Sequence, residues 1–349
     1  MKKIKLKDLL ENNQLLKEND INIEKEALSD FFDFNGDIRI TNNIKKPLVS
    51  FIIPTYNRYN MLRQMLKSIS KQIDSHIEII IINDNSSDKK YDNIINDYKY
   101  LPFKYIKNNI SNGPGISRLS GYLQAKGKYI VFADDDDFYI SESFLLEGIN
   151  KLEDNLDLVF VSYNTITYYE EEGSILLNKI NSNGQMNGQD YFLNFINKYQ
   201  KPTSTFPTIF RKEYLDSADF KNMEMMNDSS IYLRALTQGN AFIFDRYIGV
   251  YRVHPTNISK SLPHQFILDN IKEKNNIYQL ASKTFKSNLS NWQYNQILDT
   301  FRYYVIDSNC NIKNAKDFIN YTNKITSISK TKLYYNYLKF LIMKKIINR

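Results

Sequence analysis

The 349-residue chain has few of the residues that build metal clusters and covalent crosslinks. Cys310 is its only cysteine, which excludes an intramolecular disulfide and a cysteine-rich zinc site. Three histidines, His76, His254 and His264, are too few to favour a multi-histidine metal centre. Disulfides and structural metal sites are not needed for folding, because a chain of this length can bury a sizeable apolar core.

Long apolar runs and targeting signals are also absent. No stretch of about 18 apolar residues exists, so we expect no membrane-spanning helix. The basic residues near Met1 are not followed by an apolar segment, so the sequence predicts no signal peptide. These features favour a cytoplasmic location and leave open a peripheral contact with the inner face of the cell membrane.

A net positive charge is lacking in most of the chain, although the net charge of the whole chain is +7. Residues 1–46 are neutral, residues 47–260 carry a net charge of −2, and residues 261–349 carry +9. No acidic residue follows Asp317. This distribution indicates a near-neutral body with a basic C-terminal region, and it predicts no nucleic-acid partner.

Apolar strands alternate with amphipathic helices over the first half of the chain. This pattern predicts an α/β fold with a mostly parallel, Rossmann-like central sheet and helices on both faces. We expect strands at 48–53, 77–82, 103–106, 128–133, 157–169, 206–211 and 241–252. We expect helices at 4–34, 59–73, 88–99, 115–126, 188–200, 227–238 and, broken near 308–312, over 265–349.

Polar clusters follow three of the predicted strands, at Thr55–Arg58, Asn83–Asp88 and Asp134–Asp137. Parallel sheets bind their ligands at the carboxyl ends of the strands, so these clusters indicate a binding site. The four adjacent aspartates repel one another unless a cation compensates them. Carboxylates at a strand end suit Mg²⁺ or Mn²⁺, with a diphosphate completing the coordination. A solvated acidic loop is the alternative.

A phosphatase of the haloacid-dehalogenase type also has an Asp-x-Asp motif after an apolar strand. In that motif the second Asp is followed two residues later by Thr or Val, a position that Phe138 occupies here. The motif also belongs to a first strand, whereas this run follows the fourth. The phosphatase interpretation is therefore the weaker one.

Four ordered segments together resemble family-2 glycosyltransferases of the GT-A fold. Val49–Arg58 resembles the opening strand that ends in Pro-Thr-Tyr-Asn, and Ile81–Asp88 resembles the second strand with its acidic turn. Asn112–Asp137 resembles the segment that leads to Asp-x-Asp-Asp. Asn227-Asp228 and the stretch from Tyr251 to Ser259 resemble the Glu-Asp pair and the Tyr-Arg-x-His…Asn-x-Ser ending. The resemblance covers about 47–260.

The resemblance implies a metal-dependent, inverting transfer of a sugar, from a UDP-sugar donor to a glycan or lipid-linked acceptor. Asp84 would accept a hydrogen bond from the uracil ring, although an Asx turn would also suit it. Asp136 would bind Mn²⁺ or Mg²⁺, with His254 as a further ligand or as a structural hydrogen-bond partner. The remaining nucleotide-binding residues would be Pro54, Thr55, Tyr56, Asn57, Arg58, Arg118, Asp134 and Asp135.

Asp228 is the catalytic base implied by the resemblance, since it matches the second acid of the family's pair. A helix N-cap is the alternative for this residue, because it lies where a helix is expected to begin. The functional alternative is a non-catalytic module that binds sugar nucleotides or glycans. The presence of both Asp136 and Asp228 favours the enzyme.

The predicted organisation has three parts. Residues 1–46 form an N-terminal helical extension. Residues 47–260 form the glycosyltransferase domain, with a nucleotide-binding half (47–137) and an acceptor and catalytic half (138–260). Residues 261–349 form a basic helical region, whose last segment, 331–349, alternates apolar and basic residues. That segment suits an anionic membrane surface, or packing on the protein body or on a second subunit.

Overall fold

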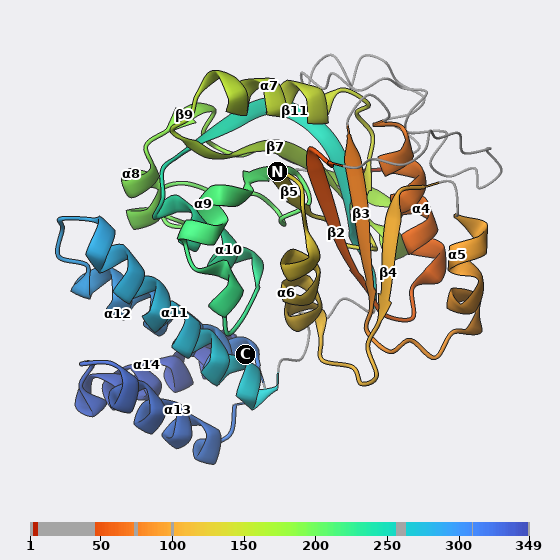
Figure 1. Cartoon of the computed structure of the whole chain (residues 1–349). Coiled ribbons are helices and arrows are strands. Elements are labelled where there is room, and N and C mark those ends of the chain that lie inside the picture. The colour runs from red at the N-terminus through yellow and green to blue at the C-terminus, as the bar shows by residue number, and fades with distance from the viewer. Residues whose placement is uncertain are drawn as a thin grey trace. The chain divides into compact units, whose positions relative to one another are not determined.

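The computed structural model describes residues 3–5, 46–72, 76–98, 101–255, 263–308 and 310–347. The chain divides into two compact units (Figure 1). The first comprises Met1–Lys221 and Met226–Pro255, and the second comprises Asn222–Met225 and Thr256–Arg349. The domain limits expected from the sequence stay predictions.

The first unit is built on a parallel sheet formed by the strands expected from the alternating pattern. β2 (Val49–Thr55) lies between β5 (Tyr129–Phe132) and β3 (Ile77–Asn83), and β3 pairs with β4 (Phe103–Lys107). All three pairings are parallel. The predicted α/β fold with a Rossmann-like sheet is confirmed in this part of the molecule.

Helices cover both faces of this parallel sheet, because alternate side chains of its strands point to opposite sides (Figure 1). Phe51 and Ile81 pack in the core cluster that includes α4 (Tyr59–Ser70). The other face carries α6 (Pro114–Gln124), in which a Cβ atom on Gly121 would lie 2.4 Å from the side chain of Ile52. Glycine therefore lets α6 approach the sheet closely. A 3₁₀ turn (Lys89–Asn93) and α5 (Ile94–Asp97) form the segment between β3 and β4.

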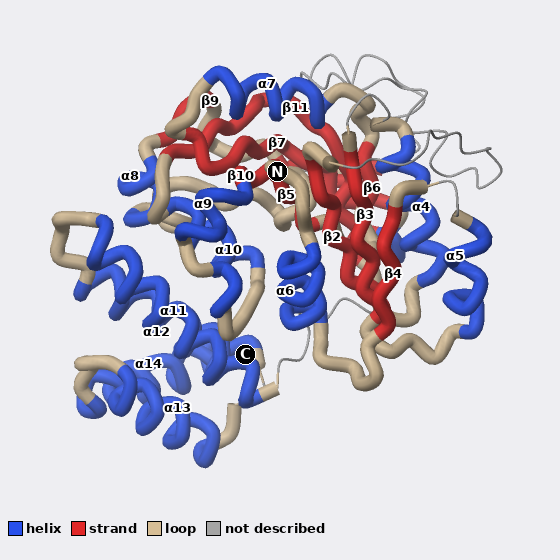
Figure 2. Tube along the Cα trace, in the orientation of Figure 1, coloured by secondary structure: helices blue, strands red, loops and turns tan. Residues whose placement is uncertain are grey.

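The sheet continues beyond β5 with further strands (Figure 2). The next three pairings along it are antiparallel. β10 (Thr208–Arg211) pairs with β5 and with β7 (Leu158–Tyr169), and β7 pairs with β8 (Ser174–Asn178). β11 (Asn240–Val253) runs parallel to β7 and antiparallel to β6 (Phe138–Tyr139) and β9 (Gly184–Met186). The helices of this half are α7 (Phe144–Asp154), α8 (Gly188–Leu193), α9 (Lys212–Ser217) and α10 (Asp228–Leu236).

The helix predicted over 4–34 is wrong at its first residues. β1 (Ile4–Lys5) is a short strand that pairs antiparallel with β8, with Ile4 opposite Ile175. Lys3 supports this pairing through an ion pair with Glu172 at 2.9 Å. The rest of the predicted segment, 6–34, lies outside the described residues.

The second unit is helical, as predicted. Its helices are α11 (His264–Thr284), α12 (Ser290–Asp307), α13 (Ile312–Ile325) and α14 (Lys330–Ile347). They share a core in which Phe301 of α12 stacks on Phe318 of α13, with ring centroids 4.2 Å apart. The break expected near 308–312 lies between α12 and α13, and two further breaks separate the other helices. No described helix is long and apolar enough to cross a membrane.

Candidate active site

The carboxyl ends of β2, β3 and β5 bring the three predicted polar clusters to one edge of the sheet. Thr55 at the end of β2 lies opposite Asn83 at the end of β3. Phe132 of β5 lies opposite Ile52 of β2, so the aspartate run begins beside the same edge. The parallel register is thus the reason that segments about 30 to 80 residues apart in the sequence meet.

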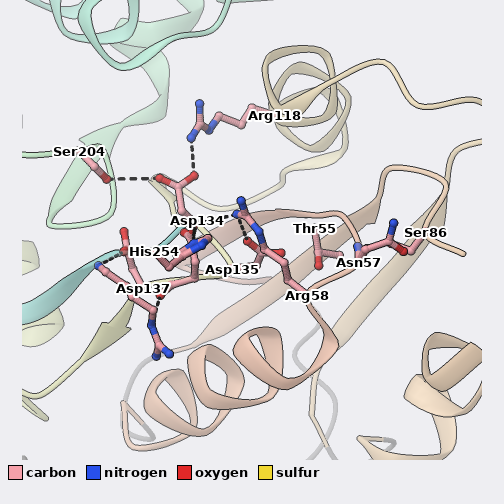
Figure 3. Close-up of polar contacts among 12 residues, drawn as sticks. Thr55, Asn57, Arg58, Ser86, Arg118, Asp134, Asp135, Asp137, Ser204 and His254 are labelled. Atoms are coloured by element: carbon pink, nitrogen blue, oxygen red, sulfur yellow. Dashed lines mark hydrogen bonds and ion pairs between the residues drawn. The ribbon is translucent and has the colours of Figure 1, made fainter. Parts of the chain in front are cut away.

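Asn57 joins the loop after β2 to the loop after β3. Its backbone N–H donates to Ser86 Oγ at 2.9 Å (Figure 3). Its Oδ1 accepts from the backbone N–H of Ser87 at 2.8 Å. Its φ of 53° is a left-handed conformation that asparagine tolerates. The conformation of this predicted pocket residue is therefore fixed before any ligand binds.

The neighbours of Asn57 differ in exposure. Pro54 and Thr55 are buried, and Thr55 Oγ1 lies 2.5 Å from the Tyr91 hydroxyl, which also accepts from the backbone N–H of Arg58. The side chain of Tyr56 is 51% exposed. Of the predicted pocket residues in this loop, Tyr56 is thus the one whose ring is open to stack on a flat base.

Asp84 holds the loop between β4 and α6. Its two carboxylate oxygens accept hydrogen bonds from five donor groups: Asn108 Nδ2, Ser111 Oγ, Ser117 Oγ and the backbone N–H groups of Asn112 and Gly113. Although burial opposes ionisation, these bonds hold the pKa of Asp84 below its usual value. The contact with a uracil ring stays a prediction, and it requires one of these bonds to be exchanged.

The four aspartates are compensated by the chain's own cationic and polar groups (Figure 3). Arg58 Nη1 donates to Asp136 Oδ2 at 2.7 Å and to Asp135 Oδ1 at 3.2 Å. His254 Nε2 lies 3.0 Å from the same Oδ2 of Asp136. Asp137 accepts from the backbone N–H of Arg252 at 3.0 Å. The run is therefore not a solvated acidic loop, and the side chains around it supply part of the countercharge expected from a metal ion.

The pKa values of the aspartates are shifted in different directions. Burial raises the pKa of Asp135 to about 7, with the neighbouring charge of Asp136 adding to the effect and Arg58 opposing it. It also raises the pKa of Asp137 well above its usual value. For Asp136 the effect of burial is outweighed, because the hydrogen bond to His254 and the charge of Arg58 hold its pKa below the usual value. Burial also raises the pKa of Asp134, although the charge of Arg118 opposes it, so Asp136 is the member of the run whose pKa is lowered.

The donor set near Asp136 fits a divalent cation only when a ligand completes it. The described residues hold no group of three or more His, Cys, Asp or Glu side chains that could hold a metal ion. Asp136 and His254 nevertheless offer an oxygen and a nitrogen ligand side by side. Magnesium is commonly held by one or two carboxylates, with substrate phosphates and water filling the other positions. The pair therefore fits Mg²⁺ or Mn²⁺ together with a diphosphate.

Asp228 is the first residue of α10, and it does not cap that helix. The cap is Asn227, whose Oδ1 accepts from the backbone N–H of Ser230 at 2.9 Å. The carboxylate of Asp228 instead lies between two cations, with Oδ1 3.9 Å from Arg118 Nη1 and Oδ2 3.9 Å from Lys201 Nζ. The alternative role of an N-cap is thereby removed.

Arg118 connects the predicted base to the aspartate run. Its Nη2 donates to Asp134 Oδ1, and its Nη1 donates to the backbone carbonyl of Met226 at 3.2 Å while facing Asp228. Ser204 Oγ donates to the other carboxylate oxygen of Asp134 at 3.3 Å (Figure 3). The structure therefore unites Asp134, Arg118 and Asp228 in one cluster, although Asp228 is far from the other two in the sequence.

Lys201 and Ser204 contact Asp228 and Asp134, and the sequence did not predict them as site residues. Both lie in the segment before β10, which carries no recognisable motif and resembles an ordinary polar loop. The pairing of β10 with β5 brings this segment beside the aspartate run. Asn257, Ile258 and Ser259, which the resemblance also used, lie outside the described residues.

Comparisons with known proteins match this architecture. The family model described as Glycosyl transferase family 2 matches residues 50–236, which is more than half of the chain. A crystal structure of S. aureus TarS in complex with UDP-GlcNAc superposes with a TM-score of 0.61 at 15% identity. The match covers 85% of this chain and 89% of that one, and it shows a shared fold.

Two relatives of known name share the sequence pattern. One is the GalNAc(5)-diNAcBac-PP-undecaprenol beta-1,3-glucosyltransferase of Campylobacter jejuni, 25% identical over 59% of this chain and 65% of the relative. The other is the UDP-Glc:alpha-D-GlcNAc-diphosphoundecaprenol beta-1,3-glucosyltransferase WfaP of Escherichia coli, 30% identical over 61% of this chain and 80% of the relative. The chain thus spans just under two thirds of the Campylobacter protein.

Proposed function

Because the chain belongs to glycosyltransferase family 2 and is a glycosyltransferase, we propose that it transfers a sugar from a UDP-sugar to a lipid-linked saccharide. The reaction inverts the anomeric carbon, and Asp228 is its base. The acceptor class is supported by the names of both relatives, each of which contains an undecaprenol-linked saccharide. The UDP-sugar is supported by the donor in the name of the Escherichia coli protein.

The observation that carries this proposal is the shared guanidinium of Arg118. One side of it pairs with Asp134, the first acid of the donor-side motif, and the other faces Asp228. A base for the acceptor must lie close to the donor sugar, because both reacting atoms meet at the anomeric carbon. The cluster supports the proposal, because Asp228, the predicted base, and Asp134, the first acid of the predicted donor motif, share one guanidinium.

The chemistry assigned to Asp228 is a single proton transfer. Its carboxylate accepts the proton of the acceptor hydroxyl as that oxygen bonds to the anomeric carbon. The bond between the anomeric carbon and the phosphate oxygen breaks at the same time, and UDP leaves with the bonding electrons. One displacement from the face opposite the leaving group inverts the configuration. Arg118, beside Oδ1, and Lys201, beside Oδ2, orient the carboxylate of Asp228.

Asp136 and His254 are the residues that would hold the divalent cation. Such an ion, when bound, neutralises negative charge on the leaving diphosphate. Arg58 now pairs with Asp136, so it has to release this carboxylate or share it when the donor enters. In this proposal the released guanidinium contacts a phosphate oxygen of the donor.

The test combines donor and acceptor. The full chain is incubated with Mn²⁺, UDP-glucose or UDP-GlcNAc, and an undecaprenyl-diphosphate-linked GlcNAc acceptor, and the lipid products are analysed by mass spectrometry. We expect one added sugar per acceptor, equimolar UDP, and inverted configuration by nuclear magnetic resonance. Failure to bind UDP in the presence of Mn²⁺, measured by calorimetry, would refute the proposal. Binding of UDP without turnover of any UDP-sugar would favour the non-catalytic module.

A further inference from the structure

α14 has an inward apolar face that belongs to the core of the second unit. Leu333, Tyr337 and Phe340 are buried there, and Tyr337 and Phe340 both contact the ring of Phe301. Lys344 reinforces the attachment, since its Nζ donates to the backbone carbonyl of Val305 at 2.8 Å. One face of the helix therefore packs on its own unit. This is the alternative in which segment 331–349 packs on the protein body.

The opposite face of α14 is also apolar, and it is exposed. Tyr335, Leu338, Ile342 and Ile346 have exposed fractions between 60% and 71%. Their spacing of three, four and four residues places them in a single stripe along the helix. A helix that is apolar on two opposite faces usually has both faces covered. The outward stripe of α14, defined by these four residues, therefore indicates a binding partner.

The charges beside the outward stripe specify the kind of partner. Lys339 and Lys345 are exposed, and at 3.6 residues per turn they lie on opposite sides of the stripe. α14 contains no acidic residue, and none occurs anywhere after Asp317. Packing the stripe of one copy against that of another would bring lysines together without acidic partners. An anionic partner is favoured instead.

We propose that the outward stripe of α14 docks on the surface of an anionic lipid bilayer. Its aliphatic side chains enter the boundary between headgroups and acyl chains, and the flanking lysines contact lipid phosphates. The proposal concerns an interaction surface in the second unit and does not depend on the transfer reaction. Its experiment therefore reads lipid binding alone.

The test is co-sedimentation of the full chain with vesicles of phosphatidylglycerol and phosphatidylcholine in equal parts, and with vesicles of phosphatidylcholine alone. We expect binding to the anionic vesicles that weakens as salt is added. The charge variant Lys339→Gln/Lys345→Gln is compared with Lys283→Gln/Lys286→Gln, which removes the same charge from exposed positions outside α14. Each lysine near the surface contributes about 1 kcal/mol, so the first pair should weaken binding by about 30-fold and the control pair much less.

A second variant tests the apolar contribution. Leu338→Ser/Ile342→Ser/Ile346→Ser removes most of the stripe, and Leu123→Ser/Leu146→Ser/Leu156→Ser removes three similarly exposed leucines from the first unit. We expect the stripe variant to lose at least about 100-fold in vesicle affinity and the control to bind as the wild type. Circular dichroism verifies that each variant keeps its helices.

Three results would overturn the proposal. Equal binding to anionic and neutral vesicles would remove the role of the lysines. Stripe and control variants that bind alike would remove the role of α14. A wild-type dimer in analytical ultracentrifugation that the stripe variant dissociates, without vesicle binding, would show that a second copy covers the stripe.

Discussion

Replacing Asp84 by asparagine should destabilise the loop between β4 and α6 even when no nucleotide is present. The carboxylate of Asp84 organises this loop through its two oxygens. Asparagine keeps one acceptor oxygen and replaces the other by an NH₂ group. The remaining oxygen can keep the hydrogen bonds from Asn108 and Ser117. The NH₂ group then faces Ser111 Oγ and the backbone N–H of Gly113.

The expected magnitude follows from these two donors. The hydroxyl of Ser111 can rotate and accept a hydrogen bond, but the N–H of Gly113, 2.8 Å from the carboxylate, cannot. A hydrogen bond to a charged group contributes about 1.5 to 3 kcal/mol, and a donor left facing another donor loses it. Water reaches part of this loop, so we expect Asp84→Asn to lower the free energy of unfolding by about 2 kcal/mol.

The assay is urea unfolding without nucleotide, with Asp92→Asn as a control at an exposed aspartate. The control should stay within about 0.5 kcal/mol of the wild type. Because the pKa of Asp84 is held below its usual value in the folded state, its contribution is complete at neutral pH. It is lost as the pH falls below about 4, so wild type and variant should converge there. An unchanged urea midpoint at pH 7 would refute the loop-organising role.

Two further predictions concern other groups. His254→Ala should weaken Mn²⁺ binding in the presence of UDP by at least about tenfold in calorimetry, and unchanged affinity would leave His254 as a hydrogen-bond partner of Asp136 only. Lys274 donates to the Gln296 carbonyl at 2.7 Å, and burial lowers its pKa to about 8. The folded state therefore binds fewer protons than the unfolded state between about pH 8 and 10.4, and wild-type stability rises with pH there. Lys274→Met should lack this rise in urea unfolding, and an identical pH profile would contradict the burial argument.

The ends of the parallel strands could be predicted from the sequence, because each buried strand is an apolar run that stops at polar residues. Continuous apolar runs such as Ile79–Ile82, together with the polar clusters that follow the strands, predict both the sheet and the edge at which the candidate site lies. The short strands β1, β6 and β9 leave no such signal. Each is two or three residues long and pairs with a strand distant in the sequence, β1 with β8 and both β6 and β9 with β11.

The sequence indicated which residues belong to the candidate site, but it did not indicate which of them contact one another. Asp134, Asp136 and Asp228 follow from motifs, whereas the pairing of Arg58 with Asp136 depends on how the loop after β2 folds over the sheet edge. Lys201 lies in a segment without periodicity or motif, and tertiary structure alone brings it to Asp228. The pairing of Arg58 and Arg118 with the aspartates also depends on tertiary structure, so it could not be predicted from the sequence.

The turnover of Asp228→Asn tests the central claim most directly. The control is Asp154→Asn, an exposed aspartate at the end of α7. If Asp228 accepts the proton of the acceptor hydroxyl, the variant should bind UDP as the wild type does and should lose about 10²- to 10⁴-fold in kcat. The control should keep wild-type kcat. Transfer by Asp228→Asn at a rate near that of the wild type would contradict the account.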